Sequence, residues 1–388
     1  MDVITRLNLI KAKPTEEILT EEDLRTLLEH GIKLKHYQGF EISGMVHLGT
    51  GLVSGLKIAQ IQRAKVETTI FLADWHSWIN DKLGSDLDII QTVAKNYFGE
   101  AMKLCVKAMG GNPNAVNLVL GSQLYAKNPE YWETVIDIAK NTTLSRVRRS
   151  ITILGRKMGE AIDFAKLIYP IMQVADIFAL QVHIAHAGID QRKAHVIARE
   201  VGKKIKFNQL KVKLGNDLLQ IKPIAVHHSI LMGLHLSERD IQALNEAEAT
   251  DKEKLKDLLI DIKMSKSKPS TAIFVHDTPE EIKRKIRNAY CPPRQLKYNP
   301  IMSIAELLIF PLDKKLFIDR PAKFGGAVEY FSFNELKDDY VNGKLHPLDL
   351  KNAVADWLIK KLEPVREYFL KGRGVTALEE LKNIRITR

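Results

Sequence analysis

The sequence predicts an α/β protein built on a parallel sheet, followed by a smaller, mostly α-helical C-terminal domain. Residues 66–73 and 116–120 are short, nearly unbroken apolar runs, which are typical of strands buried on both faces of a parallel sheet. Residues 32–61 read as a strand, a glycine-bearing turn and a helix, an arrangement that presents a helix N-terminus to an anion. Beyond about residue 300, helical segments are separated by proline and glycine.

The composition indicates how many domains the chain can form and which kinds of partner and compartment it suits. The chain has 388 residues, enough for two or three domains, and its formal net charge of +11 favours a polyanionic partner. Its two cysteines, Cys105 and Cys291, are too few for a disulfide framework or a zinc site and fit a reducing cytoplasm. We expect no membrane association, because no apolar run approaches the ~20 residues of a bilayer span and the N-terminus lacks a signal pattern.

The first stretch that carries chemistry is residues 37–50. The strand pattern breaks at Gly39, Ser43 and Gly44, and the helix begins beyond Gly49. Gly44 and Gly49 would let a nucleotide approach the backbone closely because they have no Cβ. His47 lies between them as a neutral or cationic donor to phosphate. The glycine spacing differs from the dinucleotide-binding fingerprint, and a capped surface turn is the simpler interpretation of this stretch alone.

A second stretch, Lys-Met-Ser-Lys-Ser at residues 263–267, lies far downstream. Two ammonium groups and two hydroxyls on a mobile loop can clamp a triphosphate as charge moves onto leaving pyrophosphate. The simpler interpretation is a solvated lysine loop. Between the two stretches, Asp74, Trp75 and His76 end the strand at residues 66–73, where α/β sheets bind ligands; Asp74 as the cap of the next segment is the alternative.

A helix expected to begin near Pro170 carries three polar side chains on one face. Tyr169, Gln173 and Asp176 are spaced i, i+4 and i+7. A buried acceptor that requires an O–H group would discriminate against a ligand lacking it, because the acceptor would remain unpaired. The alternative for each residue alone is an ordinary buried polar side chain. The other expected elements are helices before residue 31 with Thr15 and Thr20 as N-caps, a helical stretch at 131–166, strands at 182–186 and 221–227, and charged helices at 237–262.

The two stretches resemble the signatures of class I aminoacyl-tRNA synthetases. The first signature is usually His-x-Gly-His and is here His47-Leu48-Gly49-Thr50, so its last position departs from the pattern; the second is complete. The segment from Tyr169 to Asp176, together with Tyr37 and Gln191, resembles the amino-acid pocket of archaeal and eukaryotic tyrosyl-tRNA synthetases. This resemblance covers nearly the whole chain except the charged segment near residues 237–262.

The resemblance implies a class I Rossmann-like domain and tyrosine–tRNA ligase activity, with ATP as a substrate. Tyr37 and Asp176 would hold the phenol, and Tyr169, Gln173 and Gln191 the α-ammonium end. Catalysis would fall to His47, Gly49, Thr50, Lys263 and Lys266. ATP would contact Ser43, Gly44, His47, Gly49, Lys263, Ser265, Lys266 and Ser267. Mg²⁺ would arrive with ATP, without a metal site in the protein.

The same resemblance implies tRNA(Tyr) as a partner and a homodimer. Arg149, Arg192 and Lys193 match acceptor-stem positions, although a solvated basic face also explains the arginines. Phe324, His346 and Asp349 match anticodon-reading segments; a core aromatic and a helix cap are the alternatives for Phe324 and Asp349. The expected segments are an N-terminal helical part (1–30), a catalytic domain (31–235) with a dimerisation and acceptor-stem insertion around 122–166, a helical insertion (236–262), the signature loop with a linker helix (263–300) and the anticodon domain (301–388).

Three rival functions stay open at this point. A tryptophanyl-tRNA synthetase would share the fold and both signatures, and an indole N–H would also require an acceptor such as Asp176. A catalytically silent, synthetase-like RNA-binding protein would tolerate Thr50. A small-molecule adenylyltransferase would not need the C-terminal helical domain.

Overall fold

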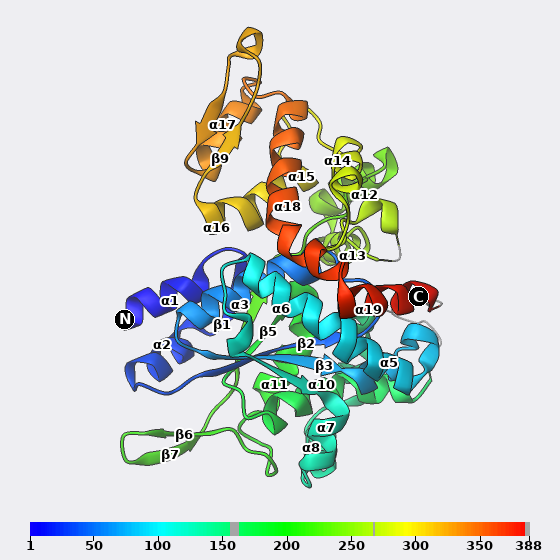
Figure 1. The fold of residues 1–388 in the computed structure, drawn as a ribbon. Coiled ribbons are helices and arrows are strands. Elements are labelled where there is room, and N and C mark those ends of the chain that lie inside the picture. Colours follow the sequence, from blue (N-terminus) through cyan, green and yellow to red (C-terminus); the bar gives the residue numbers. More distant parts are fainter. Residues whose placement is uncertain (156–162, 267, 385–388) are drawn as a thin grey trace.

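A mostly parallel six-stranded sheet lies at the centre of the molecule (Figure 1). The computed structural model describes residues 1–155, 163–266 and 268–384. Neighbouring strands run parallel except β1, which is antiparallel to β8. The spatial order is β1 (Thr15–Leu19), β8 (Ile224–His228), β5 (Ile184–Gly188), β2 (Lys35–Glu41), β3 (Glu67–Ala73) and β4 (Val116–Leu120).

The order in which successive strands are added to the sheet changes side at β2, although the strands themselves stay parallel. From β2 the chain adds β3 and β4 on one side, and then returns to add β5 and β8 on the other. Tyr37 on β2 is therefore in register with Thr69 of β3 and with Ala185 of β5. The carboxyl ends of β2 and β5 border the crevice in which open α/β sheets bind their ligands.

Helices cover both faces of this sheet. They are α1 (Val3–Lys11), α2 (Glu21–Glu29), α3 (Ser54–Arg63), α4 (Asp74–Ile79), α5 (Leu87–Val93), α6 (Gly99–Ala108), α7 (Gly121–Lys127), α8 (Tyr131–Lys140), α9 (Leu144–Ser150), α10 (Ala165–Ala179) and α11 (Arg192–Val201). A hairpin of β6 (Lys211–Leu214) and β7 (Asp217–Gln220), which the sequence did not predict, projects away from the body in Figure 1.

The C-terminal part is mostly helical, as predicted. It contains α12 (Glu238–Thr250), α13 (Lys252–Asp261), α14 (Pro279–Arg287), α15 (Pro300–Ile304), α16 (Phe310–Asp313), α17 (Phe333–Val341), α18 (Pro347–Phe369) and α19 (Gly372–Asn383), with a small antiparallel pair of β9 (Leu316–Ile318) and β10 (Val328–Tyr330).

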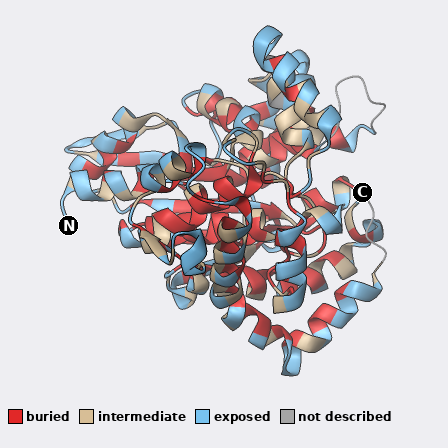
Figure 2. Ribbon diagram, turned by 90° about the horizontal axis from the view of Figure 1, so that it is seen from above, coloured by how far each residue is buried: buried red, intermediate tan, exposed pale blue. Residues whose placement is uncertain are grey.

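The C-terminal helices share a hydrophobic core with the helices that cover the central sheet. Leu56 and Met102 belong to the same buried cluster as Leu358 and Val365. The rings of Tyr97 and Phe369 lie 5.1 Å apart, although 272 positions separate them in the chain (369 − 97). Figure 2 shows buried residues continuing through the middle of the molecule. This shared core fixes the C-terminal helices against the nucleotide-binding fold.

Several expected element boundaries were wrong. Residues 1–30 are not wholly helical, because β1 forms the antiparallel edge of the sheet; Thr15 lies in that strand and donates its hydroxyl to the Ile10 carbonyl. Thr20 is an N-cap, as expected, and accepts from the Asp23 amide. Helix α10 begins at Ala165, so Pro170 lies inside it. Strand β2 continues through Gly39 to Glu41, because its parallel pairing with β3 extends to Ala73 and overrides the weak strand propensity of glycine.

Within the described residues, no helix combines the length and apolar character needed to cross a bilayer.

Candidate active site

A cavity of about 540 Å³ opens at the point where the strand order reverses. Its wall is built from the carboxyl end of β2, from helix α10, from the turn after β5 and from loop residues 263–266 and 268. These segments are far apart in the sequence. The cavity brings together most of the residues that the sequence predicted as substrate ligands: Tyr37, Ser43, His47, Gly49, Thr50, Tyr169, Gln173, Asp176, Gln191, Lys263, Ser265 and Lys266.

Tyr37 and Asp176 lie at one end of the cavity, which we call the phenol end. Both side chains are almost completely buried. Asp176 Oδ1 accepts a 2.9 Å hydrogen bond from the Tyr131 hydroxyl, and Oδ2 lies 3.5 Å from His76 Nε2. Burial lowers the pKa of His76 to about 3, so this contact joins a neutral imidazole to a carboxyl group. The phenol end thus places acceptors and hydroxyls in fixed positions around a buried space.

Electrostatics at the phenol end disfavour additional charge. Burial raises the pKa of the Asp176 carboxyl well above its usual value, while the hydrogen bond from Tyr131 opposes that rise. Burial, and then the nearby Asp176, raise the pKa of Tyr37. A neutral phenol is the kind of ligand that such a site accepts, because it adds an O–H donor and acceptor without adding a charge.

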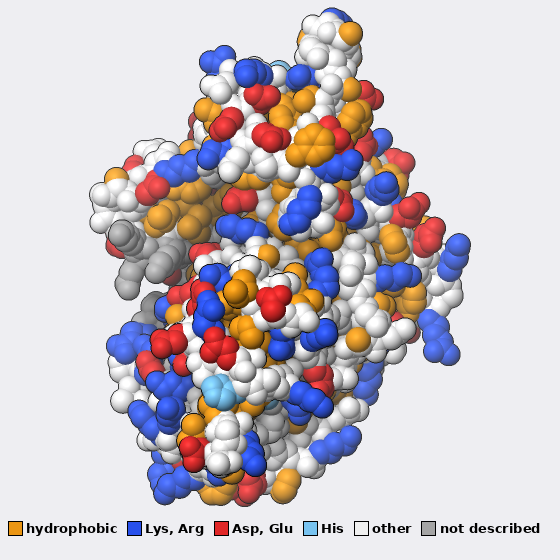
Figure 3. Space-filling view, turned by 90° about the vertical axis from the view of Figure 1, so that its left-hand side faces the viewer, with side chains coloured by type: hydrophobic (Ala, Val, Ile, Leu, Met, Phe, Trp, Pro, Cys, Tyr) orange, Lys and Arg blue, Asp and Glu red, His pale blue; other side chains and the backbone are white. Residues whose placement is uncertain are grey.

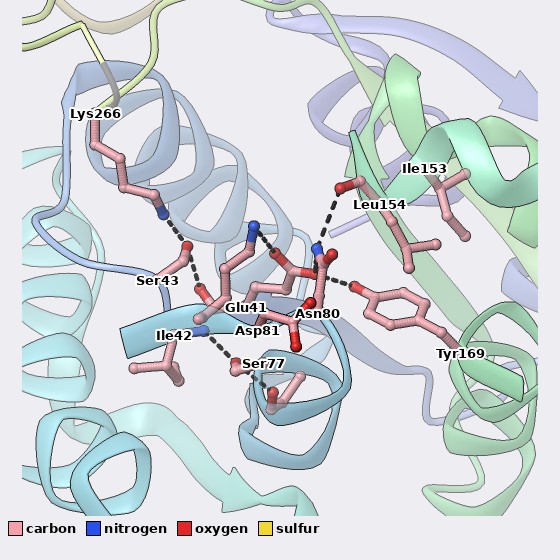
Figure 4. Close-up of polar contacts among 12 residues, drawn as sticks. Glu41, Ile42, Ser43, Ser77, Asn80, Asp81, Ile153, Leu154, Tyr169 and Lys266 are labelled. Carbon is pink, nitrogen blue, oxygen red and sulfur yellow. Dashed lines mark hydrogen bonds and ion pairs between the residues drawn. The ribbon is translucent and has the colours of Figure 1, made fainter. Parts of the chain in front are cut away.

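The middle of the cavity carries Tyr169, Gln173 and Gln191. Gln173 Nε2 donates to Gln191 Oε1 at 3.3 Å, and Gln191 Nε2 donates to the Ile153 carbonyl at 3.0 Å. The Tyr169 hydroxyl donates to Glu41 Oε1 at 2.8 Å, the contact shown in Figure 4.

Glu41 is a cavity residue that the sequence interpretation missed. Asn80 Nδ2 also donates to Glu41 Oε1, at 2.7 Å, and Lys82 Nζ lies 3.9 Å from Oε2. The period of a strand contained a usable signal, since Tyr37, Gly39 and Glu41 share one face of β2. Asp190, which follows β5 and lines the cavity beside Gln191, was also missed, as was Tyr131, which donates to Asp176; His76, at the strand end predicted to bind ligands, does line the cavity.

The opposite end of the cavity, the phosphate end, contains both signature stretches. His47 forms an isolated β-bridge with Phe274, and Lys263 forms another with Met232. The backbone of each signature stretch is therefore held by a different segment of the same chain. Lys263 Nζ donates to Asp190 Oδ2 at 2.8 Å, and Lys266 Nζ donates to Ser43 Oγ (Figure 4). The phosphate end therefore carries two ammonium groups, each held by a partner from another segment.

The charge states at the phosphate end differ between the two signatures. Burial, with Lys266 and Lys263 nearby, lowers the pKa of His47 to about 3, so this ring is neutral at neutral pH. His47 Nε2 lies 3.1 Å from Thr50 Oγ1. Burial also lowers the pKa of Lys266, to about 7. For Lys263, Asp190 outweighs the effect of burial and raises the pKa. Positive charge near a bound phosphate thus comes from the lysines.

One predicted nucleotide contact, Gly44, does not line the cavity; its φ of 129° shows that its place is in the turn, where a side chain would be strained. Ser267 lies outside the described residues.

Four side chains along the cavity each have a buried polar atom without a hydrogen-bond partner. They are Gln38 Oε1, Gln173 Oε1, His47 Nδ1 at the phosphate end, and His76 Nε2 at the phenol end, which lies 3.5 Å from Asp176 Oδ2 without forming a hydrogen bond. Unpaired buried polar atoms are rare in folded proteins because each costs desolvation energy. Their distribution along the cavity favours a long polar ligand that spans it.

The residues predicted to contact tRNA lie outside the cavity. Arg149 is exposed; Arg192 makes an ion pair with Glu17 at 2.8 Å, and Lys193 donates to Thr152 Oγ1 at 2.9 Å. On the face in Figure 3, lysines and arginines are interspersed with acidic side chains. The part of the predicted 122–166 insertion at residues 156–162 is outside the described residues.

At the other end of the molecule, Phe324 is 60% exposed, which excludes the core-aromatic alternative, and Lys323 Nζ lies 4.9 Å from its ring centroid. The N-cap of α18 is His346, whose side chain accepts from the Leu348 amide at 3.2 Å. Asp349 is therefore in the first turn and is not the cap.

Comparisons with known proteins agree with this geometry. The family described as "tRNA synthetases class I (W and Y)" matches residues 30–363. A tyrosine–tRNA ligase of Thermococcus kodakarensis is 59% identical over 389 residues, with both chains covered completely. A crystal structure of tyrosyl-tRNA synthetase complexed with L-tyrosine from Pyrococcus horikoshii superposes with a TM-score of 0.91 at 54% identity, covering 99% of this chain and 100% of that one. That of Aeropyrum pernix gives 0.79 at 39% identity, covering 98% and 99%.

The chain belongs to the class I tRNA synthetases of tryptophan and tyrosine. Within that family it belongs to the tyrosine–tRNA ligases, since full-length relatives at 55–59% identity carry that name. The predicted family, fold class and type of enzyme are thereby confirmed, with ATP as a substrate of the family's reaction.

Proposed function

We propose that the chain activates L-tyrosine with ATP, giving tyrosyl-adenylate and pyrophosphate, and then transfers tyrosine to the 3′-terminal adenosine of tRNA(Tyr). The main support is that the buried polar side chains of the phenol end and both signature stretches border one cavity. Its phenol end suits a neutral hydroxyl, and its phosphate end supplies ammonium groups.

In this proposal Tyr37 and Asp176 bind the substrate hydroxyl, and Tyr169, Gln173 and Gln191 bind the α-ammonium group. Gln173 Oε1 supports the second assignment, because an unpaired amide oxygen is an acceptor for an ammonium N–H. Glu41 adds a negative charge to the same part of the cavity. The substrate carboxylate would then point toward the phosphate end.

The activation step needs no general base, because the nucleophile is already an anion. A tyrosine carboxylate oxygen forms a bond to the α-phosphorus, and the bond from that phosphorus to the bridging oxygen of pyrophosphate breaks. Lys263 and Lys266 would follow the negative charge onto pyrophosphate, and His47, with the Gly49 and Thr50 backbone, would position the triphosphate. To do so, Lys263 must leave its hydrogen bond to Asp190 and Lys266 its hydrogen bond to Ser43, and both must bind phosphate oxygens instead.

Mg²⁺ would enter with the nucleotide and neutralise phosphate charge. The carboxylates nearest the phosphate end fit this arrangement, since Asp190 is already paired with Lys263 and Glu41 lies near Lys82. Magnesium usually keeps several waters and is held through substrate phosphates, so ATP itself would be its main ligand.

For tRNA, Arg149, Arg192 and Lys193 would contact the acceptor stem, and Phe324, His346 and Asp349 the anticodon. Exposed Phe324 can stack on an unpaired base, with Lys323 beside it for the phosphate backbone. Asp349 can accept from a guanine edge, because it is not used as a helix cap.

A homodimer through α8 would complete the assembly. Trp132 and Ile136 on this helix are 45% and 60% exposed, and Leu144 just beyond is 56% exposed. An apolar helix face of this kind marks an interaction surface. A Trp132→Asp variant is expected to shift the mass in solution from dimer to monomer, and an unchanged mass would remove α8 from the interface. A cytoplasmic location is part of the same proposal.

The deciding experiment is ATP–pyrophosphate exchange with tyrosine, tryptophan and phenylalanine in parallel. Exchange that depends on tyrosine supports the proposal. Exchange with tryptophan would favour the sister activity, and tRNA binding without any exchange would favour a silent RNA-binding protein.

A further inference from the structure

Three histidines form a continuous hydrogen-bonded line on one face of the central sheet. His36 on β2, His186 on β5 and His228 on β8 belong to three adjacent strands. His36 Nε2 lies 3.1 Å from His186 Nδ1, and His186 Nε2 lies 2.7 Å from His228 Nδ1. Since His36 is in register with Ile184, and His186 with Val226, each step advances two residues toward the carboxyl ends of the strands. The line ends at His228, which borders the cavity.

All three rings are neutral at neutral pH. His36 and His186 are fully buried and His228 is 6% exposed. Burial lowers the pKa of His36 to about 3 and that of His228 to about 4, and it lowers the pKa of His186 well below its usual value. A neutral imidazole has one N–H donor and one bare nitrogen acceptor. Each ring can therefore donate in only one direction along the line.

Only two proton arrangements satisfy both hydrogen bonds. In the outward arrangement each ring carries its proton on Nε2, so His36 donates to His186, His186 donates to His228, and His228 offers an N–H to the cavity. In the inward arrangement each proton is on Nδ1, so His228 offers a bare nitrogen to the cavity. His36 Nδ1, which is buried and has no partner, is then an acceptor in the first case and an unpaired N–H in the second.

The surrounding charges favour the outward arrangement. The charge of Lys57 on α3 lowers the pKa of all three rings, and for His36 it is the only charge that adds to the effect of burial. Burial lowers the pKa of Lys57, but its ammonium donates to the carbonyls of Leu9, Ile10 and Ala12 and to Gln60 Oε1. Four acceptors around one nitrogen fit the protonated form, whose charge disfavours an N–H on His36 Nδ1.

Asp190, near His228 at the other end of the line, also favours the outward arrangement. Its carboxylate raises the pKa of His228 against the effect of burial, and so favours a proton on the nitrogen that faces the cavity. The other titratable groups near the line are His195, beside His186, and His227, beside His228; both have a pKa lowered by burial, so neither brings a charge that would reverse the order.

We propose that the line of His36 and His186 fixes His228 as an N–H donor to a ribose hydroxyl of the substrate. In this assignment His228 contacts the substrate, and His186 and His36 are positioning residues that set which nitrogen of His228 carries the proton. The inference rests on the proposed activation of tyrosine with ATP.

The space beside Gly188 suits a hydroxyl group. A Cβ on Gly188 would lie 2.6 Å from Asp190 Oδ1 and 3.6 Å from His228 Nε2, so an acceptor and a donor flank the same small space. Lys263 occupies the other carboxylate oxygen, Oδ2. A hydroxyl both donates and accepts, and it can pair with the two groups at once. The hydroxyl could belong to ATP or to the terminal adenosine of tRNA.

Two variants of one residue test the donor. Asn in H228N places its oxygen where it can still accept from His186 but does not reach the cavity, whereas Gln in H228Q extends an amide N–H toward the former Nε2. We expect H228N to lower kcat/KM for ATP in tyrosine-dependent exchange by about three- to tenfold and H228Q to regain most of that loss. The KM for tyrosine stays unchanged in both variants.

Deoxynucleotides identify the hydroxyl. One of the two analogues, 2′-deoxy-ATP or 3′-deoxy-ATP, is expected to lower kcat/KM of the unmodified protein by the same factor as H228N does. The same analogue is expected to lower kcat/KM of H228N no further, because the substitution and the missing hydroxyl remove the same contact. If exchange is intact in H228N but transfer to tRNA falls, the hydroxyl belongs to the terminal adenosine. Full activity of H228N in both reactions, or an exchange defect in H228N that adds to the loss caused by each ATP analogue, would overturn the proposal.

The proton order has its own readout. ¹⁵N NMR of histidine-labelled unmodified protein is expected to show His228 protonated on Nε2, and His186→Phe is expected to give a mixture of tautomers. An Nδ1–H tautomer in the unmodified protein overturns the proposal even if the variants do not fold. Failure of the proposed function is distinguishable, since it abolishes tyrosine-dependent exchange in the unmodified protein.

Discussion

The two ends of the cavity are built in different ways. At the phenol end, Tyr37, Tyr131 and Asp176 come from a strand and two helices and are buried, and the Tyr131 hydroxyl donates to Asp176 at 2.9 Å. At the phosphate end, Lys263 and Lys266 are half-buried and extend from a loop to Asp190 and Ser43 on other segments.

This difference matches two physical tasks. Rejecting a ligand that lacks one hydroxyl requires partners that cannot rearrange, because only then does an unpaired group retain its full cost. Stabilising charge that moves onto a leaving group instead requires cations that can follow it. We therefore expect variants at the phenol end to change selectivity and variants at the phosphate end to change rate.

The largest effect should come from Lys266→Ala. We expect adenylate formation to slow by about 10²- to 10³-fold, as when one donor to a charged transition state is removed, while tyrosine binding is nearly unchanged. Single-turnover kinetics and equilibrium tyrosine binding separate the two quantities. Lys254→Ala, which changes an exposed side chain on α13, is the matched control. A loss of tyrosine binding in Lys266→Ala would contradict the assignment of rate to the phosphate end and of amino-acid selectivity to the phenol end.

Asp176→Ala should affect selectivity. We expect the KM for tyrosine to rise and the preference for tyrosine over phenylalanine to fall by roughly tenfold to a hundredfold, since the buried acceptor for a hydroxyl is lost. Exchange kinetics with both amino acids measure this. Asp176→Asn, which keeps an oxygen acceptor, should retain more of the preference. Unchanged selectivity would remove Asp176 from the phenol site.

The pH dependence sharpens the comparison at the phosphate end. Burial lowers the pKa of Lys266 to about 7, so the free enzyme loses this positive charge as pH rises through that value. We expect kcat/KM for ATP, which reports the free enzyme, to fall above pH 7 by up to about tenfold per unit. Lys266→Arg should abolish this fall because a guanidinium stays protonated; the same fall in that variant would assign it to another group.

Asp349→Ala tests a region outside both ends. We expect kcat/KM for tRNA charging to fall by about tenfold, because a charged acceptor for a base edge is lost, with pyrophosphate exchange unaffected. Asp356→Ala on the same helix, whose carboxylate is exposed and lies 3.9 Å from Lys283, is the control. Equal loss in both assays would indicate a folding defect.

The smallest effect should come from Thr50→Val. It removes the hydroxyl 3.1 Å from His47 Nε2 and should lower kcat/KM for ATP by about two- to fivefold, without a change in the KM for tyrosine. Thr50→Ser keeps the hydroxyl and should behave like the unmodified chain. No loss in the valine variant would show that the His47 ring is oriented by its other neighbours.

Local patterns predicted much of the site. The two signature stretches and the i, i+4, i+7 spacing of Tyr169, Gln173 and Asp176 lie within single segments, so the chain itself sets their spacing. The apolar runs at β3 and β4 were equally visible, since strands buried on both faces need no alternation. The mixed composition of residues 1–30 hid β1, because an edge strand gains its pairing from a distant partner, β8.

The sequence by itself determined the α/β class, the two nucleotide-binding stretches and the polar face of α10, because each depends on residues close together in the chain. Only the tertiary structure decided that Glu41, Asp190 and His228 border the same cavity, that Tyr131 donates to Asp176, and that the C-terminal helices share a hydrophobic core with the sheet domain. The physical reason is that side-chain partners and pKa values depend on burial and on neighbours that strand order brings together from distant parts of the chain.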